Sequence, residues 1–196
     1  MKAIILLFMT LSSSIGFSQI DNERKLALDL LNRSLEEIEL TVNSLTEVEL
    51  NYKPKDGGWT VLNCLEHLSS VEPALLMKIQ KTIDGNELDL KKDLSSEDAI
   101  IIAKVTDRTN AVNTPKPFHP KEENAKKTKE DFLSEIKATR AKMVKILTES
   151  ESNLRHLFAP YLYGEADVTQ HFLVVGAHSY RHLMQIKELI SEIKEL

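Results

Sequence analysis

The sequence is poor in the residues on which several common kinds of protein depend. Its 196 residues include one cysteine, six glycines and six prolines. A single cysteine excludes a disulfide framework within the chain and a zinc site built from clustered thiolates. The scarcity of glycine and proline argues against a collagen-like, disordered or turn-rich all-β protein. These absences favour a helical protein, and its length fits one domain.

Positive charge is also not in excess, because 25 lysines and arginines face 30 aspartates and glutamates, a formal net charge of −5. Nucleic-acid-binding domains usually carry a basic stripe, so this balance counts against nucleic acid as a partner. The glycine-rich motifs of common nucleotide-binding proteins and the nucleophile elbow of serine hydrolases are missing from the sequence. These absences exclude several classes of protein but do not yet say what the domain does.

The one long apolar run stands at the start of the chain. The largely apolar stretch Ala3–Leu11 follows a lysine, and small residues at Gly16 and Ser18 come after a serine-rich segment. This order is typical of a secretory signal peptide, and the run is shorter than the roughly 20 residues that span a bilayer. We expect residues 1–18 to be removed on export to the periplasm or the medium. Residues 19–196 would then form a soluble mature domain without a membrane span.

Apolar residues at spacings of three and four predict four main helices in this domain. The predicted helices cover about Asp21–Glu47, Val61–Ile83, Thr128–Thr148 and Asp167 to the C-terminus, with a short helix at Ser95–Lys104. Thr60 and Asp167 are the expected N-caps of two long helices, and Ser95 or Ser96 that of the short one. The proline-containing stretch Thr106–Lys127 is expected to be a long crossover, and Asn153–Ala166 a second connection. Long helices joined by long crossovers predict an all-α four-helix bundle.

The histidines give the most specific indication of function. His178 and His182 are four residues apart, so they share one face of the last helix and can bind one metal ion. Both lie at the edge of the apolar stripe, which directs them toward a neighbouring helix. His67 occupies a similar position on the second helix. Three neutral imidazoles can hold a divalent metal with one coordination position open, where a hydroxide or a thiolate is favoured.

Periodicity alone leaves alternatives for these histidines. A single pair at this spacing often lies in solvent or in an apolar core, and nothing selects His67 over His119 or His156 as the third ligand. His119 lies among prolines in an expected loop, and His156 precedes a helix break. About 10 Å of helical rise separates His171 from His178, too far for both to bind one metal with His182. We therefore expect His171 to line the pocket.

Glu72 lies within the apolar face of the second helix, where an unpaired carboxylate is costly. It is expected to pair with Arg140 or Arg181, or to act as a general base on a metal-bound water. His171 and Glu72 are therefore the pocket candidates, and no catalytic role can be assigned to either from the sequence.

The other chemically notable side chains have simpler interpretations. Cys64 is one helical turn before His67, but a small buried core residue is the commoner outcome. Trp59 is expected to pack its loop onto the end of the bundle rather than to form a pocket wall. Tyr161 and Tyr163 lead into the last helix, where they either cover the site or pack at the protein surface.

Several of these motifs follow one another in an order that resembles a known family. The similar segments are Asn51–Pro54, Gly58–Val61, Cys64–Leu68, Phe132–Leu147 and the H-x-x-R-H-x-x-Q-I block His178–Ile186. Together they resemble the DinB-like superfamily, in its damage-inducible-protein and bacillithiol-transferase branch, over about Leu26–Glu195. The resemblance implies a four-helix bundle with a nickel or zinc ion bound at the positions of His67, His178 and His182. It also implies a homodimer, the state of many members.

The resemblance further implies a reaction class. Characterised members transfer small thiols to electrophiles or isomerise with a thiol cofactor. A metal-dependent thiol S-transferase or hydrolase with a small-molecule electrophile is therefore expected, and a low-molecular-weight thiol is the implied cosubstrate. A signal peptide is unusual for enzymes that use a cytosolic thiol. His171 stands where relatives often carry a large apolar or aromatic side chain, which predicts a more polar pocket. The alternative is a non-catalytic bundle that binds a metal or a ligand.

Overall fold

The structure is a computed structural model that describes residues 13–85, 87–109, 112–121, 124 and 126–195, with side chains from residue 22 onward. Most of the predicted signal peptide lies outside the described residues, and residues 13–18 form the beginning of the first helix. Removal of the signal peptide therefore stays a prediction. Within the described part of the chain, no helix is both long enough and apolar enough to cross a membrane.

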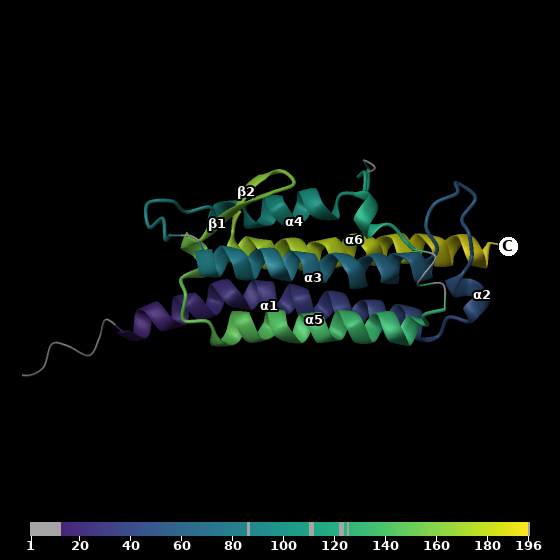
Figure 1. The fold of residues 1–196 in the computed structure, drawn as a ribbon, viewed down its shortest axis with the longest axis horizontal. Helices are drawn as coiled ribbons and strands as arrows, with labels where there is room; N and C mark the ends of the chain where they lie inside the picture. Colours follow the sequence, from purple (N-terminus) through teal and green to yellow (C-terminus); the bar gives the residue numbers. More distant parts are fainter. Residues whose placement is uncertain (1–12, 86, 110–111, 122–123, 125, 196) are drawn as a thin grey trace, which may run out of the picture.

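Four long helices run side by side along the molecule and form a bundle (Figure 1). They are α1 (Ser13–Asn43), α3 (Val61–Gly85), α5 (Lys129–Glu149) and α6 (Val168–Lys194). The predicted all-α four-helix bundle is confirmed, and so are two of the predicted N-caps. Thr60 Oγ1 accepts a hydrogen bond from the Asn63 backbone N–H at 3.1 Å, and Asp167 Oδ1 accepts one from the Gln170 N–H at 2.8 Å.

The four helices are connected in an order that requires a long crossover. Helix α1 packs along α6, and the two run in the same direction, as do α3 and α5 (Figure 1). Parallel neighbours cannot be joined by a tight turn, so the chain must return along the bundle between α3 and α5. This crossover contains the short helix α4 (Asp98–Thr106), which packs against α6, and the 3-10 helix η2 (Lys116–Phe118). The crossover predicted after the short helix is confirmed.

Three local predictions need correction. The first helix ends at Asn43, and a separate one-turn helix, α2 (Glu47–Leu50), follows with a capping box formed by Thr46 and Glu49. The short helix begins as the 3-10 turn η1 (Ser95–Glu97). Neither Ser95 nor Ser96 is its cap, because the N-cap positions of η1 and α4 fall on Leu94 and Glu97, and neither has a side-chain cap bond.

The connection before α6 contains a β-hairpin that the sequence pattern did not predict. Strand β1 (Phe158–Tyr161) pairs antiparallel with β2 (Gly164–Asp167), so a two-residue turn joins them. Gly164 has a φ of 140°, a conformation that favours glycine.

A polar layer divides the apolar core of the bundle into two parts. One cluster of buried side chains includes Leu31, Leu76, Met143 and Phe172, and the other includes Ile38, Leu65, Phe132 and Leu183. Between them each long helix contributes one buried polar residue, namely Ser34, Glu72, Arg140 and Ser179. His178 lies next to Ser179 in the chain, so the candidate metal site adjoins this layer.

Candidate metal centre

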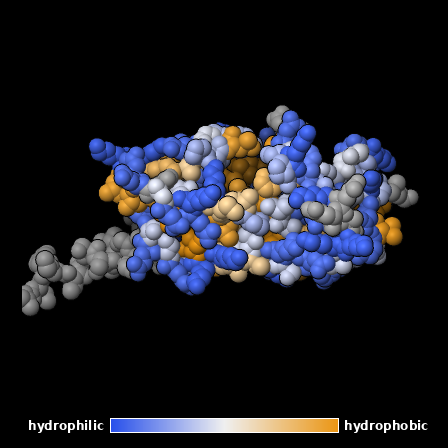
Figure 2. Space-filling view, in the orientation of Figure 1, coloured by the Kyte–Doolittle hydropathy of each residue, from blue (hydrophilic) through white to orange (hydrophobic). Residues whose placement is uncertain are grey.

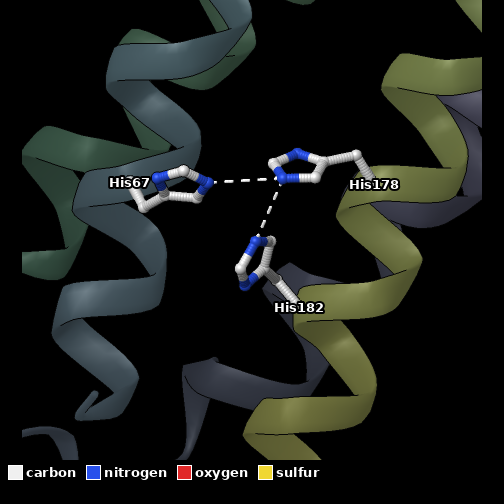
Figure 3. A group of neighbouring side chains, drawn as sticks. All are labelled: His67, His178 and His182. Atoms are coloured by element: carbon white, nitrogen blue, oxygen red, sulfur yellow. Dashed lines mark hydrogen bonds between the residues drawn. The ribbon is translucent and has the colours of Figure 1, made fainter. Parts of the chain in front are cut away.

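Three histidines from two helices meet inside the bundle. His67 projects from α3 toward His178 and His182 on α6, and the imidazole rings point toward one another (Figure 3). The Nε2 atom of His178 is 3.3 Å from Nε2 of His67 and 3.2 Å from Nε2 of His182. Each side chain offers one ligand atom, and these atoms all lie within 4.8 Å of one another. The structure thus brings together the three histidines proposed as metal ligands.

The spacing of these nitrogens suits a metal ion. In tetrahedral coordination with zinc–nitrogen bonds of about 2.0–2.1 Å, two ligand nitrogens lie about 3.3 Å apart. The two Nε2–Nε2 distances of 3.2 and 3.3 Å match this value. Imidazole nitrogens also suit nickel, so the donor set fits either of the two metals that the resemblance implies.

Hydrogen bonds on the far side of two rings fix the tautomers that metal binding needs. His67 Nδ1 lies 2.9 Å from the backbone carbonyl oxygen of Phe118, and His182 Nδ1 lies 3.1 Å from Gln185 Oε1. Because these oxygens only accept, both Nδ1 atoms carry the proton and both Nε2 atoms present a lone pair to the cluster. A neutral His178 carries one ring proton, so its Nε2 can donate a hydrogen bond to only one of these two Nε2 atoms. A divalent cation could bind all three Nε2 atoms at once.

The electrostatic environment keeps the three rings neutral. Burial lowers the pKa of His67 and lowers that of His182 well below its usual range. Burial, with a smaller contribution from neighbouring positive charge, lowers the pKa of His178 to about 3. The Nδ1 atom of His178 is buried and has no hydrogen-bond partner among the described residues. Neutral imidazole is the form that binds a metal at pH 7.

Trp59 lies beside two of these histidines and also packs on the core cluster at the start of α3, so it combines the expected packing role with that of a site wall. Its ring centroid lies 4.9 Å from that of His67 and 6.1 Å from that of His182, and it is nearly parallel to the latter at 15°. Trp59 comes two residues before α3 begins, and His67 is on the second turn of this helix. The chain that enters α3 therefore passes beside the histidines.

The long crossover covers the site from another side. Besides the Phe118 bond to His67, Glu66 Oε1 accepts hydrogen bonds from the Lys121 N–H at 2.8 Å and from Asn124 Nδ2 at 2.9 Å. Two consecutive residues of α3 thus hold this segment in place. Figure 2 shows a hollow with hydrophobic residues on its floor, between α4 and the crossover segment that carries η2.

Glu72 pairs with Arg140, one of the two partners expected for it. Its carboxylate oxygens each accept a bond of 2.7 Å from the Arg140 guanidinium, and Ser179 Oγ donates to it at 3.0 Å. Arg140 also donates to the Leu31 carbonyl oxygen at 2.9 Å. These bonds occupy the carboxylate, which favours a structural role over general-base catalysis.

His171 lies at the hairpin, away from the three histidines. Its Nε2 donates to the Ala159 carbonyl oxygen at 3.2 Å, and its ring meets Tyr161 edge to face at 6.4 Å. Burial lowers its pKa to about 4, so it is neutral at pH 7. Tyr161 in turn contacts Tyr163 edge to face at 5.9 Å. The described contacts of His171 fasten β1 to α6 rather than line the metal site.

The remaining chemically active side chains do not join the cluster. Cys64 is fully buried, and burial raises its pKa to about 12, which makes its thiol unreactive. His119 is exposed and donates from Nε2 to the Thr114 carbonyl oxygen at 2.8 Å, and its ring centroid lies 6.2 Å from that of Trp59 in an edge-to-face arrangement. His156 bonds to the backbone carbonyl of Asp89 at 3.0 Å.

Gln185 accepts the hydrogen bond from His182 Nδ1, so its replacement tests whether this bond supports metal binding. We expect Gln185→Leu to weaken metal binding about 10- to 100-fold, because the Nδ1–H of His182 loses its acceptor. Gln185→Glu retains an acceptor and should keep most of the affinity. Competition with a chromophoric chelator measures the effect, and Gln80→Leu, at an exposed position of α3, is the matched control. Wild-type affinity in Gln185→Leu would rule out this orienting role.

Comparisons with known proteins show which family and which fold this chain resembles. Residues 30–186, which include all three histidines, match the DinB superfamily. The Bacillus subtilis (strain 168) protein YuaE is 24% identical over 160 residues, which cover 78% of this chain and 90% of YuaE. The fold is similar to that of YfiT from Bacillus subtilis, described as a probable metal-dependent hydrolase with an unusual four-helix bundle topology. The TM-score is 0.60 at 13% identity, over 97% of this chain and 94% of YfiT. The chain belongs to the DinB superfamily.

Proposed function

We propose that the protein is an enzyme that binds a divalent metal, zinc or nickel, through His67, His178 and His182. The observation that carries this proposal is the convergence of three Nε2 atoms, two of which have their tautomers fixed from behind. Such an ion supplies a Lewis acid that makes a water molecule or a thiol nucleophilic at neutral pH. The proposed reaction is attack of that nucleophile on a small electrophile.

The charge of the proposed ligands and the residues around them favour an anionic nucleophile. All three proposed ligands are neutral, so no ligand charge offsets the charge of the cation, and an anionic hydroxide or thiolate is stabilised in the open position. Trp59 shields one side of the cluster, and the crossover carrying Phe118 shields another. Both limit access of bulk water, which strengthens electrostatic interactions inside the site.

Two comparisons support the reaction class from different directions. The description of YfiT as a probable metal-dependent hydrolase supports water as the nucleophile. The resemblance to bacillithiol transferases supports a small thiol. We further propose that the protein acts after export, on the strength of the signal-peptide pattern in residues 1–18. An exported enzyme would use water or a thiol present outside the cytosol.

Metal removal and reloading test the proposal. We expect about one zinc or nickel ion per chain. Hydrolysis of 4-nitrophenyl acetate, or conjugation of chlorodinitrobenzene with mercaptoethanol, should then occur in the loaded protein. It should not occur in the metal-free protein or in His67→Ala. A bound metal that supports neither reaction, and whose removal sharply lowers the melting temperature, would instead identify the non-catalytic, structural alternative.

A further inference from the structure

The long crossover is attached to α3 at two points beside the proposed metal site. The part that carries η2 packs on α3 (Figure 1). His67 Nδ1 donates to the Phe118 carbonyl oxygen at 2.9 Å. Its neighbour Glu66 accepts at Oε1 from the Lys121 N–H at 2.8 Å and from Asn124 Nδ2 at 2.9 Å. The two attachment points are close in the crossover, so movement at one affects the other.

The stretch of the crossover around Phe118 has little local freedom. Three of the seven residues 114–120 are prolines, whose backbone φ angle is fixed. The Phe118 N–H donates to the Pro115 carbonyl oxygen at 2.9 Å, and the His119 ring donates to that of Thr114 at 2.8 Å. His119 has the extended backbone expected before a proline, with φ −72° and ψ 151°. The position of the Phe118 carbonyl oxygen therefore depends on where the whole stretch is anchored.

Glu66 has the properties of an anchor for this stretch. Its side chain is only 7% exposed, and a buried carboxylate is costly unless it is hydrogen-bonded. Bonds to an ionised acceptor are also stronger than bonds between neutral groups. Both bonds described above for Glu66 go to the crossover, and Glu66 is not in the group of side chains whose ligand atoms converge. An effect of Glu66 on the metal would therefore pass through the crossover.

We infer that Glu66 is a positioning residue for the metal site. It anchors the stretch that carries Phe118, and the Phe118 carbonyl oxygen keeps His67 in the tautomer and orientation that present Nε2 to a cation. The inference rests on the proposed function, because it takes the three histidines to bind a metal. Outer hydrogen bonds to a ligand ring raise metal affinity. The coupling is reciprocal, so a bound metal strengthens docking of the crossover by the same factor.

Two substitutions of Glu66 in the full chain test the inference. Glu66→Leu should weaken Zn²⁺ binding about 10-fold, near the lower end of the usual cost of losing an outer hydrogen bond. Glu66→Gln should keep most of the affinity, because its amide oxygen still accepts from Lys121 and Asn124. Competition with a chromophoric chelator measures binding, at a temperature where circular dichroism shows each variant folded. Equal losses in both variants would overturn the inference, because they would report the missing negative charge instead.

Thr82→Val is the matched control. Thr82 is also a nearly buried residue of α3, and its hydroxyl donates to the Lys78 carbonyl oxygen at 2.9 Å. It lies roughly four helical turns beyond His67, so the variant should keep the wild-type affinity. Asn124→Asp gives a second test, which stands even if Glu66→Leu does not fold. It places a second carboxylate against Glu66 and should also weaken Zn²⁺ binding; unchanged affinity would contradict the anchoring role.

Amide hydrogen exchange of the Lys121 N–H measures the same coupling from the side of the crossover. Saturating Zn²⁺ should slow this exchange about 10-fold in the wild type, by reciprocity. Unchanged exchange, or unchanged Zn²⁺ affinity in Glu66→Leu, would show that Glu66 has no positioning role and would leave the metal site intact. A wild-type protein that binds neither Zn²⁺ nor Ni²⁺ would instead overturn the proposed function, and this inference with it.

Discussion

Replacing His178 and His182 together by alanine is expected to abolish stoichiometric metal binding and leave the helical fold intact. The double variant keeps His67 as a single imidazole, which cannot hold a divalent ion against competing water. Alanine has the highest helix propensity, so α6 should persist. Elemental analysis after dialysis measures the bound metal, and circular dichroism checks the helix content. Metal content equal to that of the wild type would show that the ligands lie elsewhere.

The single tryptophan offers a second measurement of the same prediction. Trp59 is the one tryptophan of the chain, and its ring centroid lies 4.9 Å from that of His67. Binding of Ni²⁺ or Co²⁺ should therefore change its fluorescence in the wild type and leave it unchanged in the double variant. His156→Ala is the matched control, because His156 bonds to the Asp89 carbonyl and not to the cluster. It should keep both the metal and the fluorescence response.

The sequence allowed the helices to be predicted because their signals are local. Apolar spacing depends on neighbours three and four residues away, and caps such as Asp167 depend on the next turn. The same local rule placed His178 and His182 on one face. The approach of His67 to these two histidines cannot be predicted from local spacing, because it depends on how α3 packs against α6. His67 was therefore identified through the family resemblance, and periodicity alone left His119 and His156 as equal candidates.

The features that were missed depend on contacts between distant parts of the chain. The bond from His67 to Phe118 uses a backbone carbonyl, which leaves no trace in the residue type. The position of the Trp59 ring beside His67 depends on tertiary packing, which the residue type does not reveal. The hairpin before α6 has a two-residue turn after β1, and β1 contains Pro160, which weakens the alternating pattern that identifies strands.

The polar layer of the core leads to the largest expected effect on stability. Glu72→Leu should destabilise the fold by about 3–5 kcal/mol, because it leaves the Arg140 guanidinium buried without its counter-ion. For a chain of this size, that corresponds to a fall in melting temperature of roughly 6–20 °C. Thermal unfolding followed by circular dichroism measures it. Lys145→Met, which breaks the exposed pair between Lys145 and Glu149, should change stability by less than about 1 kcal/mol.

A double-mutant cycle separates the strength of the Glu72–Arg140 pair from the cost of leaving one charge buried. Glu72 and Arg140 are 0% and 4% exposed, so each charge has lost its hydration and depends on the other. Replacing both, with Glu72→Leu and Arg140→Met, removes both desolvation costs. The double variant should therefore be more stable than either single variant, with a coupling of several kcal/mol. Additive losses in the double variant would contradict this account, and would show that the bonds of Arg140 to Leu31 and Ser179 dominate its contribution.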